Sequence, residues 1–222
     1  MNERVLVIVD DAFEMSTLVA ALRLHDIDVI AEAKSESVGM NLLRRLQPDV
    51  VLLDMNVLGI SAVKIAVKMR KENQSIGIVI LTSCSDLRLM GESNDEVPAG
   101  AKILVKKSIV DFTVLCDAIR ESKMAAIEQH KVTWINGNTS FQDHGVATLM
   151  AHLTNTQAEV LRLVANGMTN AQIGRTRYVS EKSVEQVISR VAQELHVQPD
   201  QNKNMRVQLV GEYYRWLGAP HH

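Results

Sequence analysis

Cysteine is scarce in this chain, and its two cysteines, Cys84 and Cys116, lack the spacing of a metal site. Both lie in apolar stretches, so we expect reduced thiols in a cytoplasmic protein. Long hydrophobic runs are also missing, because no apolar stretch approaches the roughly 18 residues of a membrane span. The N-terminus passes directly into strand-like sequence, so we expect neither a signal peptide nor a membrane anchor.

An excess of charge of one sign is absent too, since 24 lysines and arginines nearly balance 26 aspartates and glutamates. The formal net charge of −2 favours no particular class of partner. The hydrophobic fraction of 46% and the charged fraction of 23% are those of an ordinary globular protein. With 222 residues, the chain is long enough for one large domain or two small ones.

The first half contains short apolar stretches that alternate with segments of helical spacing. Continuous runs of valine, leucine and isoleucine indicate strands that are buried on both faces of a parallel sheet. We expect strands at residues 4–9, 28–31, 50–53, 76–81 and 102–105, and helices at residues 13–24, 35–46, 61–71 and 111–127, with a weaker helical region around Gly91. Because parallel strands need right-handed helical crossovers, this order predicts a five-stranded, doubly wound, flavodoxin-like α/β domain.

Polar side chains stand at the carboxyl ends of four of these strands, namely Asp10 and Asp11, then Asp54, Thr82 and Lys106. The carboxyl ends of parallel strands meet at one edge of a sheet, so we expect one pocket. Each of these residues alone is weak evidence, because it is common in a cap or a turn. The whole set in this order is stronger evidence. Grouped carboxylates need a cation, and an all-oxygen site suits Mg²⁺. A carboxylate beside a divalent cation, a hydroxyl and an ammonium can attack phosphorus and become an aspartyl phosphate.

Residues 1–127 resemble the receiver domain of two-component response regulators, through Val9-Asp10-Asp11, Leu53-Asp54, Leu81-Thr82 and Val105-Lys106. The resemblance implies that Asp54 accepts a phosphoryl group from a histidine kinase, that Thr82 is the switch hydroxyl and that Lys106 contacts the phosphate. It also implies that Asp11, Asp54 and the backbone carbonyl of Asn56 ligate Mg²⁺, with Asp10 helping through water.

Three features depart from the pattern of that family. Leu58 stands where receivers usually have proline, although the expected Gly59 follows it. Ile103 stands where a tyrosine or phenylalanine usually swings inward after phosphorylation. The spacing also leaves Lys107 as an alternative to Lys106, which we prefer because Lys107 would place Lys106 in a slot for a core aliphatic residue. Phosphorylation of Asp54 is therefore chemically possible. These departures leave open how phosphorylation would be coupled to an output.

The second half begins with turn-forming sequence and then becomes helical. Residues 128–152 read as a linker, with a short helix predicted at residues 146–150. Thr154 or Asn155, Thr169 and Ser180 each precede a helical segment as N-caps. Three short helices with tight turns predict a helix-turn-helix, whose last helix would enter the major groove. A fourth helix is expected at residues 202–217, with a stripe formed by Val207, Val210, Tyr214 and Leu217.

Residues 153–197 resemble the LuxR-type DNA-binding domain. The motifs are Leu153-Thr154, Glu159-Val160-Leu161, Asn166-Gly167-Met168-Thr169-Asn170, Ile173 and Val179-Ser180-Glu181-Lys182-Ser183-Val184. Joined to a receiver, this domain is similar to NarL-type transcription regulators. The resemblance implies a DNA-binding domain over residues 153–217.

The expected DNA surface is the polar face of the predicted recognition helix. Its residues are Lys182, Glu185, Gln186, Ser189, Arg190 and Gln193, and Arg175 and Arg177 are further expected phosphate contacts. The family usually has lysine at the positions of Glu185 and Glu194. Because phosphate neutralisation supplies most non-specific affinity, these carboxylates predict weakened or altered DNA binding.

The hypothesis is a cytoplasmic, homodimeric transcription regulator with no membrane association, in which phosphorylation of Asp54 permits DNA binding. One alternative is a phosphorylation-independent regulator of the same fold, suggested by Leu58 and Ile103. The other is a protein-interaction module that has lost DNA binding, suggested by Glu185 and Glu194. An enzyme with small-molecule turnover is not expected, because no pair of nucleophile and base lies outside the acidic pocket.

Overall fold

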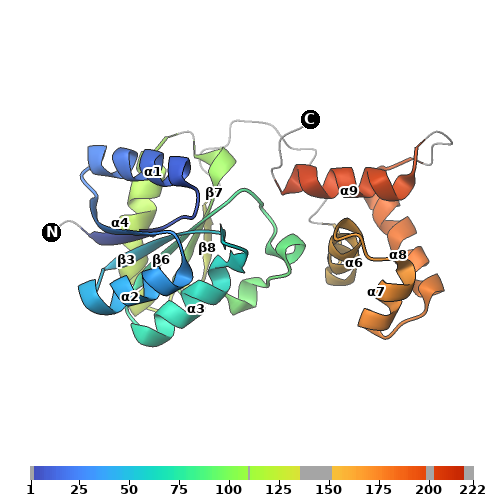
Figure 1. Cartoon of the computed structure of the whole chain (residues 1–222), viewed down its shortest axis with the longest axis horizontal. Coiled ribbons are helices and arrows are strands. Elements are labelled where there is room, and N and C mark those ends of the chain that lie inside the picture. The colour runs from blue at the N-terminus through green and yellow to red at the C-terminus, as the bar shows by residue number, and fades with distance from the viewer. Residues whose placement is uncertain (1–2, 110, 136–151, 199–202, 218–222) are drawn as a thin grey trace. The chain divides into compact units, whose positions relative to one another are not determined.

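The computed structural model describes residues 3–109, 111–135, 152–198 and 203–217 of the chain. The chain divides into two compact units (Figure 1). The first consists of Met1–Ser83 and Asn94–Thr139, and the second of Cys84–Ser93 and Ser140–His222. Within the described ranges, none of the helices combines the length and the apolar character needed to cross a membrane.

The first unit alternates strands and helices in the predicted order. Its strands are β1 (Arg4–Ile8), β2 (Asp28–Ala33), β3 (Val50–Asp54), β4 (Asn56–Val57), β5 (Ile60–Ser61), β6 (Gly77–Thr82), β7 (Lys102–Val105) and β8 (Thr133–Ile135). Its helices are α1 (Ala12–Leu24), α2 (Glu36–Leu46), α3 (Ala62–Glu72) and α4 (Thr113–Ile127), with 3₁₀ turns η2 (Asn94–Glu96) and η3 (Lys106–Ser108). The expected ends of the five predicted strands and four predicted helices lie within two residues of those observed.

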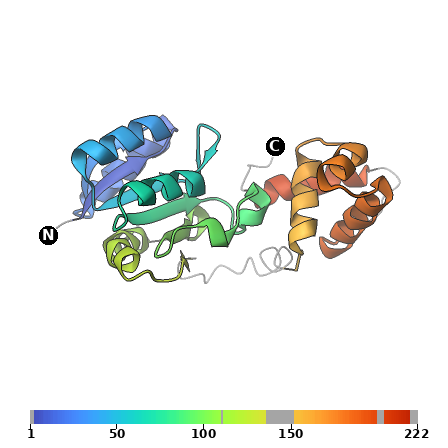
Figure 2. The same cartoon turned by 90° about the horizontal axis from the view of Figure 1, so that it is seen from below.

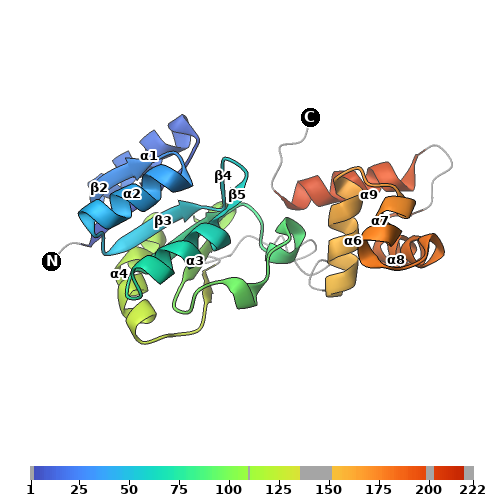
Figure 3. The same cartoon turned by 60° about the horizontal axis from the view of Figure 1, so that its bottom comes forward.

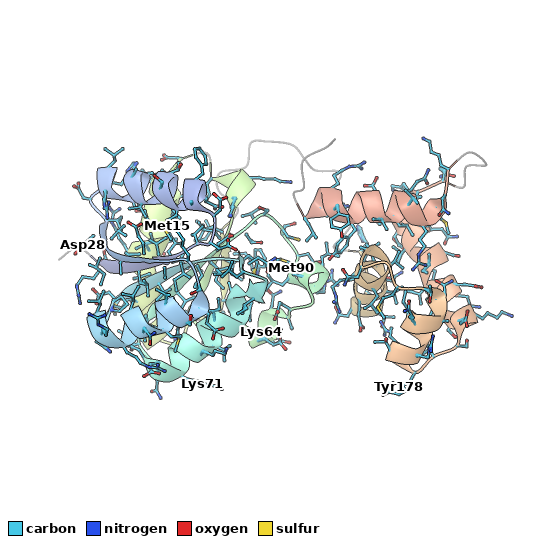
Figure 4. All side chains as sticks on the ribbon, viewed as in Figure 1. Met15, Asp28, Lys64, Lys71, Met90 and Tyr178 are labelled. Atoms are coloured by element: carbon cyan, nitrogen blue, oxygen red, sulfur yellow. The ribbon has the colours of Figure 1, made fainter. Side chains whose placement is uncertain are left out.

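The main sheet has the strand order β2-β1-β3-β6-β7-β8, with every neighbouring pair parallel. Helices α1 and α4 cover one face and α2 and α3 the other (Figure 1). On the first face, Met15 points from α1 toward the sheet (Figure 4) and packs in one cluster with Val7, Leu52 and Ile119. This burial of apolar side chains from both elements confirms the doubly wound α/β class.

Among the described residues, the main sheet contains six strands rather than the predicted five. The sixth, β8, lies inside residues 128–152, which were expected to be a linker throughout. It covers the edge of β7, and the indole N–H of Trp134 donates to Asn94 Oδ1 at 3.1 Å. A strand of three residues is too short to show periodicity in a sequence. The helix predicted at residues 146–150 lies outside the described residues.

The crossover from β6 to β7 also differs from expectation. Residues 83–101, all of which are described, contain the 3₁₀ turns η1 (Leu87–Met90) and η2 but no α-helix. The weaker helix predicted around Gly91 is therefore wrong. Gly91 ends η1 in the left-handed region, at a φ of 78°, after a single turn capped by Asp86.

The second unit contains the four predicted helices (Figures 2 and 3). They are α6 (Asn155–Ala165), α7 (Asn170–Arg177), α8 (Glu181–Glu194) and α9 (Met205–Trp216). Thr154 and Thr169 close capping boxes with Gln157 and Gln172, and the Ser180 hydroxyl accepts from Ser183 N–H. The local capping chemistry therefore sets where three of these helices begin.

The buried stripe of α9 differs in part from the predicted one. Leu209, Tyr213 and Trp216 face the core, whereas Val207 is 67% exposed and Tyr214 44% exposed. Both sets have helical spacing, so periodicity alone could not choose between them. Val210 and Leu217 of the predicted stripe are partly buried and pack against the same core cluster.

The segment Cys84–Ser93 is part of the second unit's core. Cys84 and Leu89 are 2% and 0% exposed and pack in one cluster with side chains of all four helices. The Tyr213 hydroxyl donates to the carbonyl oxygen of Leu89 at 2.6 Å. Arg88 Nη1 donates to the carbonyl oxygen of Leu153 at 2.7 Å. Ten residues from within the crossover thus complete the helical unit.

Replacing Leu89 by alanine should destabilise the helical unit selectively. Removal of a fully buried leucine side chain costs about 2–5 kcal/mol of unfolding free energy. The chain has two tryptophans, one per unit, so variants that keep only Trp216 or only Trp134 report each unit's unfolding by fluorescence. The transition seen by Trp216 should move to lower denaturant concentration by more than that seen by Trp134.

The control for this experiment is Leu24→Ala, because Leu24 is 84% exposed on α1 and its loss should change stability by less than about 0.5 kcal/mol. An unchanged Trp216 transition in the Leu89 variant would show that Leu89 contributes no packing energy to this core.

Candidate functional site

The register of the parallel strands brings the predicted pocket residues to one edge of the sheet. Ile8 of β1 pairs with Leu53 of β3, and Asp54 pairs with Leu81 of β6. Thr82, the last residue of β6, pairs with Val105 of β7. The residues that follow each strand therefore emerge side by side, as expected for chemistry at the carboxyl end of a parallel sheet.

Asp54 and Lys106 form an ion pair at this edge. Lys106 Nζ lies 2.7 Å from Asp54 Oδ1, and the two side chains are 27% (Lys106) and 15% (Asp54) exposed. Lys107, the alternative considered from spacing, is exposed to solvent. The structure thus places the ammonium of Lys106, not that of Lys107, on the carboxylate.

Burial and charge act on this pair in opposite directions. Burial raises the pKa of the Asp54 carboxyl above its ordinary value, although the hydrogen bond and charge of Lys106 oppose the change. Burial disfavours the Lys106 ammonium, but hydrogen bonds to Asp54 and Glu14 raise the pKa of the lysine above its ordinary value. The lysine is consequently held as an ammonium at neutral pH.

Leu58 has a structural explanation in a small hairpin that follows Asp54. Strands β4 and β5 pair across Leu58 and Gly59, which have φ values of 50° and 79° (Figure 3). Asp10 Oδ2 accepts a hydrogen bond from the Leu58 N–H at 2.7 Å. Proline fixes φ near −65° and has no N–H, so it could neither adopt this turn nor bind Asp10.

Glu14 is a pocket residue that the sequence reasoning missed. Its backbone N–H donates to Asp11 Oδ1 at 2.7 Å, which caps α1. Its own carboxylate oxygen Oε1 lies 2.6 Å from Lys106 Nζ. The available signal was its position in the first turn of the helix after Asp11, because that turn starts at the same edge of the sheet.

Thr82 and Ile103 are both fully buried. Thr82 closes β6, next to the strand that ends in Asp54. Ile103 lies within β7 and is paired with Ile80 on one side and with Trp134 on the other. An aliphatic strand residue in this place packs in the sheet, and it offers no ring to act as a switch.

The predicted Mg²⁺ ligands are near one edge but not gathered around one point. Among the side chains that the structure describes, no three or more of histidine, cysteine, aspartate and glutamate are placed to hold a metal ion. Asp10 and Asp11 instead accept backbone N–H groups, Asp54 pairs with Lys106, and Asn56 is exposed on β4. The donor set is nevertheless the all-oxygen kind that suits Mg²⁺.

In the second unit, the predicted DNA-facing residues share one exposed face of α8. They line a single groove, formed by Lys182, Glu185, Gln186, Ser189, Arg190 and Gln193. Val184, Ile188 and Val191 turn the opposite face toward the core. Glu194 is exposed at the end of the same helix. The helix is therefore amphipathic in the manner of a recognition helix.

The two arginines of α7 lie elsewhere. Arg177 pairs with Glu159 at 2.7 Å and also donates to Thr156, so it ties α7 to α6. Arg175 is exposed and lines a separate concavity with Tyr178, whose side chain projects from the turn before α8 (Figure 4). The tie to Glu159 argues for a structural role of Arg177.

Comparisons with known proteins agree with both units. Residues 5–120 match the response regulator receiver domain, and residues 151–203 match the bacterial regulatory proteins of the luxR family. The chain is 31% identical over 207 residues to the transcriptional regulatory protein LiaR of Bacillus subtilis (strain 168), covering 87% of this chain and 91% of LiaR.

Solved structures of similar fold include the two-component response regulator RcsB in a complex with DNA. Its TM-score is 0.57 at 17% identity, with 98% of this chain and 100% of that chain covered. A structure of two RcsB dimers bound to two parallel DNAs has a TM-score of 0.56 at 19% identity, with the same coverage. At this identity the likeness shows the fold.

The pocket at the sheet edge, the amphipathic α8 and the two matching family models lead to one conclusion. The chain belongs to the response regulators that join a receiver domain to a LuxR-family helix-turn-helix domain and regulate transcription.

Proposed function

We propose that Asp54 is the phosphoryl acceptor of this response regulator and that its phosphorylation controls DNA binding by α8. The observation that carries the proposal is the ion pair of Asp54 and Lys106 at the carboxyl end of a buried strand. The donor is a histidine kinase, in keeping with the receiver family. The protein is cytoplasmic, where kinase and DNA are both accessible, and it has no turnover of small-molecule substrates.

In the reaction, a carboxylate oxygen of Asp54 attacks the phosphorus of the phosphohistidine. The new oxygen–phosphorus bond forms as the nitrogen–phosphorus bond breaks, and the histidine of the kinase leaves. Lys106 stabilises the charge that develops on the phosphoryl oxygens, and the Thr82 hydroxyl donates to one of them in the product. Positioning and charge neutralisation are the main contributions of the protein in such transfers.

Asp11, Asp54 and the backbone carbonyl of Asn56 would hold a Mg²⁺ ion, with Asp10 assisting through water. When bound, this ion supplies positive charge against the phosphoryl oxygens. Oxygen donors at the ends of the neighbouring strands β1 and β3 support this assignment. Asp10 meanwhile orders the hairpin after Asp54 through its bond to Leu58.

DNA is bound through the polar face of α8, with Lys182 and Arg190 on phosphates and Gln186 and Glu185 on base edges. Arg175 is a further phosphate contact, whereas its neighbour Arg177 positions α7. The protein binds as a homodimer, a proposal supported by the dimeric RcsB assembly on DNA.

Two other functions remain in competition, each on a specific observation. Ile103 favours a regulator that acts without phosphorylation, because it cannot replace the aromatic switch. Glu185 and Glu194 favour a protein-interaction module without DNA binding, because carboxylates on α8 repel phosphates. Labelling of Asp54 and the salt dependence of DNA binding separate all three.

Treatment with acetyl phosphate and Mg²⁺ should add one phosphoryl group to the wild-type chain and none to Asp54→Asn. The amide of asparagine cannot act as the nucleophile in its place. Intact-mass spectrometry detects the adduct. The matched control is Asp28→Asn, an exposed residue at the amino end of β2, which should react like the wild type. Equal labelling of the Asp54 variant would place the acceptor elsewhere.

Substituting Lys182 or Arg190 by alanine should weaken non-specific DNA binding and reduce the slope of log affinity against log salt by about one for each phosphate that is no longer neutralised. Glu185→Lys should strengthen binding at every salt concentration. Fluorescence anisotropy with labelled duplex DNA measures both effects. Arg215→Ala is the control, since Arg215 pairs with Glu212 on α9. Absence of binding at any salt would favour the interaction module.

A further inference from the structure

The ammonium of Lys106 lies between two carboxylates. One belongs to Asp54, at 2.7 Å, and the other to Glu14, at 2.6 Å. Lysine has three donors, so it can serve both groups at once. Glu14 is 34% exposed, which makes its charge only partly screened by water.

Because of this geometry, Glu14 would compete with a phosphoryl group on Asp54 for the ammonium of Lys106. A phosphorylated Asp54 would carry more negative charge than a free one, and that charge needs the ammonium that Glu14 also binds. Glu14 also adds a fourth carboxylate to Asp10, Asp11 and Asp54 at this edge. An added negative charge favours a divalent cation and disfavours an oxyanion.

We propose that Glu14 is a positioning residue that holds Lys106 and sets the balance between Mg²⁺ and phosphoryl binding in the pocket. The inference rests on the proposed function of Asp54. The proposal predicts two opposite effects, because removing one negative charge must weaken binding of the cation and strengthen binding of the anion.

The test is Glu14→Gln in the full chain, which keeps the size of the side chain and removes its charge. Calorimetric titration with MgCl₂ alone should show weaker Mg²⁺ binding by about fivefold, the effect of a half-buried charge worth about 1 kcal/mol. Titration with beryllofluoride at saturating Mg²⁺, followed by fluorine NMR, should show binding that is about fivefold tighter. Glu36→Gln, which removes a carboxylate paired with Lys68 on α3, should change neither.

Shifts in the same direction, or no shift in either titration, would overturn the role of Glu14 and leave that of Asp54 standing. If the wild-type chain binds neither Mg²⁺ nor beryllofluoride, both the role of Glu14 and that of Asp54 are overturned. Structural damage to the pocket would weaken the binding of both ligands together, so opposite signs identify the charge of Glu14 on Lys106 as the cause.

A second observation concerns the segment that follows the switch hydroxyl. Only Ser83 separates Thr82, at the end of β6, from Cys84, which is buried in the helical unit. Within that unit, Arg88 donates to the carbonyl of Leu153 and to Asn155 Oδ1, just before and at the start of α6. The hydroxyl of Tyr213 on α9 donates a hydrogen bond to the carbonyl oxygen of Leu89.

We infer that Cys84–Ser93 carries the signal of Asp54 into the helical unit directly along the chain, in place of the aromatic residue that Ile103 replaces. This inference also rests on the proposed function. Any shift of Thr82 toward a phosphoryl group pulls on a segment whose side chains form part of the core around α6 and α9. The response therefore depends on how firmly that segment is held.

Tyr213→Phe tests this link, because it removes one buried hydrogen bond and preserves the ring. In the full chain, the ratio of DNA affinity with and without beryllofluoride should fall about fivefold, as expected from the loss of one hydrogen bond of about 1 kcal/mol. Hydrogen exchange of residues 84–93 should become faster. Tyr214→Phe, on the same helix with its hydroxyl 3.5 Å from the Ala165 carbonyl, is the matched control and should keep the wild-type ratio.

An unchanged affinity ratio in the Tyr213 variant, with beryllofluoride bound at Asp54, would overturn the inference. A wild-type ratio of one between the DNA affinities with and without beryllofluoride would also overturn the inference. Asp54 would then remain the phosphoryl acceptor, but its modification would not change DNA binding. Failure of beryllofluoride to bind at all would instead overturn the proposed function together with the link.

Discussion

The pairing of Asp54 with Lys106 depends on strand register, and much of the receiver unit serves that register. β3 and β7 are not neighbours, because β6 lies between them. A carboxylate and an ammonium meet at 2.7 Å because Asp54 pairs with Leu81 of β6, and Lys106 follows directly after Val105, which pairs with the next β6 residue. The apolar faces of those strands are buried under helices on both sides, and a slip by one residue would turn those faces over. Hydrophobic packing thus fixes the position of the charges.

The structure follows from the sequence most directly where one dominant force decides it. Unbroken aliphatic runs identified the buried strands, because such runs are stable only between two helical layers. Hydroxyl caps identified the starts of the helices after Thr154, Thr169 and Ser180. The pocket residues Asp54 and Lys106 followed from the strand ends, since topology alone brings those ends together.

Sequence patterns do not decide the structure where two arrangements satisfy the same pattern or where a residue's partner is distant in the chain. The predicted stripe of α9 is only partly correct, because two sets of residues share helical spacing and only the core decides between them. No local pattern indicates the role of Glu14, because its partner Lys106 is remote in the chain. Leu58 does depart from the family pattern, but the sequence gives no sign that its backbone N–H donates to Asp10. Strand β8 could not be predicted from the sequence, because three residues are too few to show periodicity.

The placement of Cys84–Ser93 in the helical core has a consequence for how this protein can be divided or recombined. The chain crosses between its two units at three places rather than one. A C-terminal fragment that starts at Ser140 would lack Leu89 and leave the hydroxyl of Tyr213 without its acceptor. Exchange of the DNA-binding part between relatives is therefore not a simple joining of ends. A working chimera must carry the matching ten residues from the middle of the donor's receiver.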